Sequence, residues 1–248
     1  GASLSYGDGV PFVEALSLKT QNLTASASAA SPGAPISVDA RLTNLGLVAP
    51  GIIGPATLGG TLTLRDSQGD AVDVNLNFNG PSGVAANIAG QVQELGQRLD
   101  LAIRGNAPLA LANSFIAPNA ITGPLDFDLR LSGPPALSSL SGRANVRGAR
   151  VSVPTANLAV TGLGGVITLS GGQVSPDITG SLGNGGQFRV TGPVTLTAPY
   201  NASLNVALSA LGLRDPQLYE TTVNGTLTVT GPLTGGERIG GALALGRT

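Results

Sequence analysis

Apolar and polar residues alternate with a period of two along most of the chain. In the segment 36–42, aliphatic residues occupy every second position, and Ser37, Asp39 and Arg41 stand between them. The same alternation recurs in five further segments: 72–78, 99–103, 125–131, 204–208 and 227–229. Successive side chains of a β-strand point to opposite faces of a sheet. The sequence therefore predicts an all-β protein of roughly a dozen to sixteen one-sided strands with antiparallel neighbours.

Glycine and proline mark the ends and bends of these strands. Gly-Pro turn signals occur at Gly80-Pro81, Gly123-Pro124, Gly133-Pro134, Gly192-Pro193 and Gly231-Pro232. Gly-Gly pairs lie inside or beside strands at 59–60, 164–165, 171–172, 185–186 and 240–241. An ordinary hairpin turn explains any one pair. Their recurrence favours a sheet that bends along its length, because glycine permits the bulges and kinks of a curled sheet.

Helical signals are weak by comparison. The segment 108–116 predicts the one short helix, since Leu109, Leu111, Ala112 and Phe115 fall near one helical face after a proline suited to a first turn. The uncharged run 45–60 contains Pro50, Pro55 and several glycines, which exclude a membrane-spanning helix there.

Composition excludes much chemistry. The 248 residues include no His, Cys, Met or Trp, so there is no imidazole base, thiolate nucleophile or zinc finger. Charged residues make up 11% of the chain and the net charge is -1, which leaves no basic stripe for nucleic acid. We therefore expect neither an enzyme nor a nucleic-acid-binding protein, and no cofactor.

Three motifs in the sequence resemble metal-binding, catalytic or nucleotide-binding sites, but their spacing or setting argues against each of these functions. Asp66, Asp70 and Asp73 do not have the spacing of a calcium loop and predict a solvated hairpin turn. Asp126, Asp128 and Arg130 share one face of one strand, which favours a water-facing ladder over an acid/base pair. The glycines from 162 to 165 lack the last glycine of a dinucleotide fingerprint.

Several stretches resemble the TamB family of translocation and assembly module proteins. The most specific stretches are 215–233 and 234–241; upstream, 105–115, 121–125 and 162–169 are similar to the family's strand-to-helix segment and Gly-x-aliphatic units. The resemblance covers residues 60–248, whereas the first sixty match only in style. The absence of an initiator Met and the repeating pattern at both ends indicate a fragment of a longer protein.

The resemblance implies a fold, a location and partners. TamB proteins are AsmA-like bridge-like proteins of Gram-negative envelopes, with an amino-terminal inner-membrane helix and a long periplasmic β-taco. The family is linked to phospholipid movement between inner and outer membranes, and to outer-membrane protein assembly with the barrel TamA. By resemblance, residues 1–248 form one continuous periplasmic segment of such a protein, without its anchoring helix.

The apolar positions of the alternating strands are the predicted lining of a hydrophobic groove that binds phospholipid acyl chains. They are Leu62, Leu64, Val72, Val74, Leu76, Phe78, Leu99, Leu101, Ile103, Leu125, Phe127, Leu129, Leu131, Leu204, Val206, Leu208, Leu227 and Val229. For each of them, packing into a closed core such as a β-sandwich remains the alternative.

Two other functions remain open. A secreted structural or adhesive β-solenoid would have parallel coils filled by its own side chains. A chaperone-like template would pair an exposed sheet edge with nascent outer-membrane strands by β-augmentation.

Overall fold

A computed structural model describes residues 2–7, 10–65, 70–156, 158–183, 185–215 and 219–246. Within them the fold is all-β, with antiparallel pairing between strands and a single short α-helix, α1 (Asn113–Ile116). The predicted fold class is confirmed. The parallel coils of the solenoid alternative are contradicted, because every pairing described is antiparallel.

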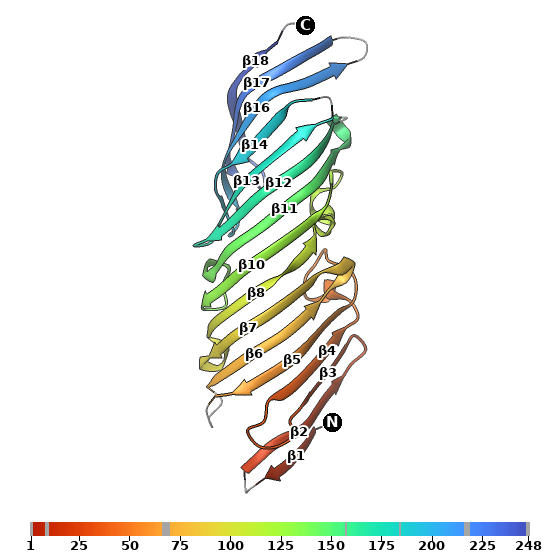
Figure 1. Cartoon of the computed structure of the whole chain (residues 1–248), viewed down its shortest axis with the longest axis vertical. Coiled ribbons are helices and arrows are strands. Elements are labelled where there is room, and N and C mark those ends of the chain that lie inside the picture. The colour runs from red at the N-terminus through yellow and green to blue at the C-terminus, as the bar shows by residue number, and fades with distance from the viewer. Residues whose placement is uncertain are drawn as a thin grey trace. The chain divides into compact units, whose positions relative to one another are not determined.

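The chain divides into two compact units, of which the first comprises residues 1–107 and 128–136. Its strands follow one another in chain order, and each pairs with the next (Figure 1). They are β1 (Ala2–Gly7), β2 (Val10–Lys19), β3 (Leu23–Ser28), β4 (Ile36–Leu42), β5 (Ala56–Leu64), β6 (Ala71–Asn79), β7 (Ala85–Gln93) and β8 (Arg98–Pro108). Its 3₁₀ turns are η1 (Leu45–Leu47), η2 (Pro81–Gly83) and η3 (Glu94–Gly96).

The second unit comprises residues 108–127 and 137–248. Its strands are β9 (Ala120–Thr122), β11 (Leu140–Val153), β12 (Leu158–Ser170), β13 (Gln173–Leu182), β14 (Gln187–Thr191), β15 (Val194–Thr195), β16 (Asn201–Asp215), β17 (Tyr219–Pro232) and β18 (Arg238–Leu245). Its helical turns besides α1 are η4 (Leu109–Ala112), η5 (Leu137–Ser139) and η6 (Pro154–Ala156). The strand β10 (Pro124–Gly133) is shared between the units, and it pairs with β8.

Strand number and length differ from the prediction. The described strands number more than the predicted maximum of sixteen, partly because Gly123 separates β9 from β10, and Gly192-Pro193 separates β14 from β15. Several strands are longer than a simple alternation indicates; β16 has 15 residues. Bulges explain the difference, since an extra residue reverses the alternation without ending the strand. The first sixty residues join the same ladder, because Ile36 of β4 lies opposite Leu62 of β5.

The predicted helix at 108–116 is shorter than expected. Pro108 ends β8, residues 109–112 form the 3₁₀ turn η4, and only α1 is α-helical. In the part of the chain that the structure describes, no helix has the length and hydropathy needed to cross a membrane.

The Gly-Gly pairs fall into two groups. Those at 171–172 and 185–186 lie in turns, as the hairpin interpretation predicts. The other three lie within strands, and the second glycine of each has a positive φ: 152° at Gly60, 147° at Gly165 and 145° at Gly241. This conformation is essentially restricted to glycine. These residues are glycine kinks, which introduce curvature into a sheet.

Candidate functional site: an aliphatic sheet face

One face of the first unit is aliphatic from strand to strand. A row of cross-strand partners runs over five strands, from β4 to β8. Each of its residues lies directly opposite the next one: Ile36, Leu62, Val74, Gly90 and Leu101. Residues directly opposite in an antiparallel pair project from the same face. The register therefore converts the alternation of separate strands into a continuous apolar surface.

The predicted lining residues of β5, β6 and β8 lie on rows of this kind. Leu62 faces Val74, Leu64 faces Val72, and Leu76 is followed across the sheet by Ile88 and Ile103. Val74 is buried, Leu64 is exposed, and the others are half-buried: Leu62, Val72, Leu76, Phe78, Leu99, Leu101, Ile103, Leu129 and Leu131.

The second unit repeats the arrangement. Val190, Val206 and Leu227 form one row across β14, β16 and β17, and Leu204 faces Val229. The predicted lining residues here are half-buried throughout: Leu125, Phe127, Leu204, Val206, Leu208, Leu227 and Val229.

The alternating pattern does not identify every residue of this face. Ile88 and Val92 of β7 complete rows in the first unit, and Ile167, Ile178 and Phe188 do so in the second. The alternation in β7 is weak because alanine and glycine occupy many of its positions. Pairing register, rather than local pattern, is the signal that identifies these residues.

Part of the second unit's face is closed by its own side chains. Val146, Ala149 and Leu163 form one buried cluster, against which Leu109 of η4 packs. Leu182, Leu211 and Val223 form another. Phe188 contacts both clusters and also lies over Gly180, where a Cβ would come within 2.8 Å of its ring.

Away from these clusters the aliphatic surface is accessible. Among the described residues no large side chain is fully buried, and the buried apolar residues are few and mostly small. A β-sandwich interior of this length would contain many fully buried Leu, Val and Ile side chains. The face thus offers non-directional apolar contact, and none of the paired positions named above is charged.

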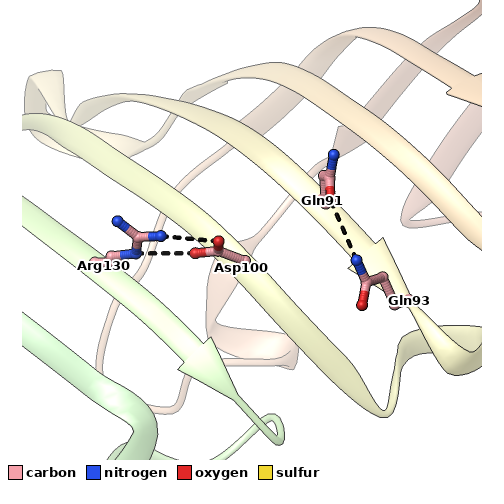
Figure 2. A network of polar contacts seen from close by, with 4 residues as sticks. All are labelled: Gln91, Gln93, Asp100 and Arg130. Atoms are coloured by element: carbon pink, nitrogen blue, oxygen red, sulfur yellow. Dashed lines mark hydrogen bonds and ion pairs between the residues drawn. The ribbon is translucent and has the colours of Figure 1, made fainter.

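The opposite face is polar and carries cross-strand ion pairs. Arg130 of β10 donates to Asp100 of β8 through Nε and Nη2, at 2.9 and 2.8 Å (Figure 2). On the neighbouring β7, Gln93 donates to Gln91 at 3.2 Å (Figure 2). The ion pair raises the pKa of Arg130, chiefly through the hydrogen bond to Asp100.

The remaining members of the predicted polar ladder are also paired with arginines. Arg104 donates to Asp128 at 3.0 Å, and Arg147 pairs with Asp126. These side chains are largely exposed. An arginine on the adjacent strand therefore holds each carboxylate, which is the arrangement of a water-facing ladder.

Of the aspartates around residue 70, Asp66 lies outside the described residues. Asp73 pairs with Arg65 across the β5–β6 hairpin. Where the structure describes the chain, no group of three or more acidic side chains is placed to hold a metal ion.

Asp177 provides a pH-dependent prediction. Arg189 donates two hydrogen bonds of 2.7 Å to its carboxylate, and these lower the pKa of Asp177, opposed by a smaller desolvation effect. A carboxyl with a depressed folded pKa stabilises the fold above its ordinary pKa, and this contribution is lost as the pH falls through the folded value. Because the pair is exposed, the effect on stability is small.

NMR titration of the Asp177 carboxyl carbon measures this directly. We expect its midpoint below that of an ordinary aspartate, and Arg189→Gln to return it toward the ordinary value. An unchanged midpoint in Arg189→Gln would contradict the pairing.

These features define a class: an all-β protein whose antiparallel strands present an accessible aliphatic face on one side and an ion-paired polar face on the other. Residues 69–220, more than half of the chain, match the family of type II secretion system (T2SS) protein N, and the chain belongs to this family. Neither the curated proteins nor the solved structures gave a significant match. Membership indicates a secretion-related role and an envelope location. The match names a secretion component and not TamB, so the resemblance to TamB remains a prediction.

Proposed function

We propose that the aliphatic face carries phospholipid acyl chains between the inner and outer membranes, as the resemblance to TamB predicts. The observation that supports this proposal is the pairing register of the strands. It aligns aliphatic side chains from strand to strand without placing a charge among them. Such a surface has few directional groups, so it suits a ligand that slides rather than one held in place.

The energetic need for such a surface is large. Each methylene exposed to water costs about 0.8 kcal/mol, so two sixteen-carbon chains crossing water unaided would cost on the order of 20 kcal/mol. Half-buried Leu, Val and Ile side chains retain accessible apolar area that an acyl chain can cover. A surface that shields most of the chain removes most of this cost.

Membership in a secretion family and the resemblance to TamB are compatible within one proposal. A periplasmic segment that supplies lipid to the outer membrane supports the assembly of proteins there, including a TamA-like barrel reached through regions outside this chain. The proposed location is the periplasm, and the resemblance to TamB implies anchoring in the inner membrane by an amino-terminal helix.

Mass spectrometry of lipids that co-purify with the chain tests the proposal. We expect phospholipid at a defined ratio to protein, removed by detergent and restored by vesicles. Purified protein that carries no lipid, and takes up none from vesicles while folded, would contradict it.

The template function retains one supporting observation. Ile239, Leu243 and Leu245 of β18 are exposed, and the pairing described for β18 is with β17. Crosslinks from β18 to strand peptides of outer-membrane proteins would favour the template, whereas lipid photocrosslinks to Leu76 or Val206 favour the conduit.

A further inference from the structure

The connection between β4 and β5 exposes aliphatic side chains at its tip. Leu47, Val48 and Ile53 are 55%, 71% and 79% exposed. The segment 43–64 that contains them has no charged residue. Clustered exposed aliphatic residues without interspersed charge are unusual for a connection in contact with water only.

This connection is held in a fixed shape. The Asn44 side chain accepts hydrogen bonds from the backbone N–H groups of Gly46 at 3.0 Å and Gly54 at 3.2 Å. The Leu45 N–H donates to the Gly54 carbonyl at 2.6 Å, which closes the base of the loop. Gly54 lies against the buried Pro81, since a Cβ at this glycine would come within 2.6 Å of the proline ring.

The fixed shape separates two sets of side chains. Leu45, Ala49 and Ile52 are half-buried and face the protein, whereas Leu47, Val48 and Ile53 face outward. Because the hydrogen bonds at Asn44 maintain this separation, the exposed aliphatic residues are not the result of an unstructured tip. Little conformational entropy remains to be lost when they bind an apolar phase.

Two cations lie beside the loop on the polar face. Lys19 at the end of β2 and Arg41 of β4 both face Thr24 of β3 in register, and all three are exposed. The row continues through Thr57 and reaches no acidic residue. Asp39, two residues before Arg41 on the same face, is the acid closest along β4. Exposed aliphatic side chains with cations beside them match the surface of an anionic bilayer. The aliphatic side chains suit its apolar interior, and the cations suit its negatively charged headgroups.

We propose that the loop 44–55, with Lys19 and Arg41 beside it, docks on an anionic phospholipid bilayer and inserts Leu47, Val48 and Ile53 among the acyl chains. The docking concerns a loop and not the sheet face. It therefore deepens the proposed lipid function while remaining separately testable.

Tryptophan reporters test the insertion, because the chain contains no other tryptophan. Ile53→Trp is mixed with vesicles of phosphatidylcholine containing phosphatidylglycerol, some with brominated acyl chains. We expect a blue-shifted emission and quenching by bromine. The matched control is Leu95→Trp, which replaces an 83% exposed leucine on the β7–β8 connection and should show neither change.

Vesicle sedimentation of the chain tests the contributions of the tips and the cations. The triple variant Leu47→Ser, Val48→Ser, Ile53→Ser should bind at least ~10-fold more weakly than wild type. Lys19→Gln with Arg41→Gln should remove the preference for phosphatidylglycerol and leave the weaker binding to phosphatidylcholine. Circular dichroism and the unfolding temperature confirm that each variant is folded.

Three outcomes overturn the docking. They are unquenched emission from Ile53→Trp, equal sedimentation of the triple variant and wild type, and absence of vesicle binding together with a crosslink from the loop to a protein partner. The last assigns the loop to a protein interface. The triple variant can also fail to sediment with vesicles and still carry lipid on its sheet face. That result would support the conduit and the docking loop as two separate sites.

Discussion

Replacing Val206 by aspartate is expected to reduce lipid bound to the chain by at least ~10-fold while expression continues. Val206 lies between Val190 and Leu227 on the aliphatic face. A carboxylate there faces the bound acyl chain without a counter-ion, and a charge taken from water without a partner costs several kcal/mol. Leu129→Asp and Leu76→Asp should act in the same way in the first unit. Lipid content by mass spectrometry and lipid transfer between vesicles are the measurements.

The neighbouring residue supplies the control. Ala207 lies on the polar face of the same strand, opposite Arg189 and Thr226. Ala207→Asp introduces the same charge one residue away and should leave lipid content unchanged. In the first unit, Asn77→Asp is the corresponding control for Leu76→Asp. Equal lipid content in Val206→Asp and Ala207→Asp, with both variants folded, would remove the aliphatic face from the lipid-binding hypothesis.

Replacing Gly165 by alanine is expected to destabilise the second unit by about 3 kcal/mol or more. Gly165 has a φ of 147° and lies between Val146 and Ile178 on the aliphatic face. A Cβ there would overlap the carbonyl oxygen of Asp177 and lie 3.0 Å from the Cα of Ile178. Since these are backbone atoms of the adjacent strand, relief requires β12 and β13 to separate. Thermal and urea unfolding followed by circular dichroism measure the loss.

The preceding glycine provides a matched control. At Gly164 a Cβ would lie 3.6 Å from the Val146 carbonyl oxygen, an ordinary contact, and its φ is not in the left-handed region. Gly164→Ala should therefore change stability by less than about 1 kcal/mol. The same contrast is expected between Gly59 and Gly60 in β5. Similar losses for Gly164→Ala and Gly165→Ala would show that the kink is not the cause.

The sequence pattern was sufficient to predict which residues face the apolar side in strands where aliphatic residues alternate with strongly polar ones. Alternation in β4 and β6 sets aliphatic residues against Asp, Asn, Arg or Ser, and the structure places their apolar residues on one face. It was insufficient for β7, where Ala and Gly reduce the contrast. Bulges between Val146 and Val151 of β11, and between Leu208 and Leu211 of β16, change which positions face inward. An alternation that assigns residues to faces correctly at one end of these strands therefore assigns them to the wrong face at the other end.

The lining could be predicted only as a set of residues, and not as an open or closed surface. Whether an apolar face is covered depends on contacts between distant segments, such as Leu109 of η4 on the cluster around Ala149. The ion pair between Asp177 and Arg189 likewise requires the register of β13 against β14, which alternation does not specify. The position of the Gly-Gly pairs was evident from sequence, but the backbone conformation that separates kinks from turns was not.

Within each unit most strands pair with the strand that precedes or follows them in the chain, and this has a consequence for how the protein is made. Each hairpin can form as soon as its two strands have been synthesised or exported, because no distant segment has to be found first. Folding can then advance in the order of the chain, and unfolding should proceed in steps from the outermost hairpins rather than in one transition. A protein assembled in this way tolerates gain or loss of a hairpin, so its length can change without a new core.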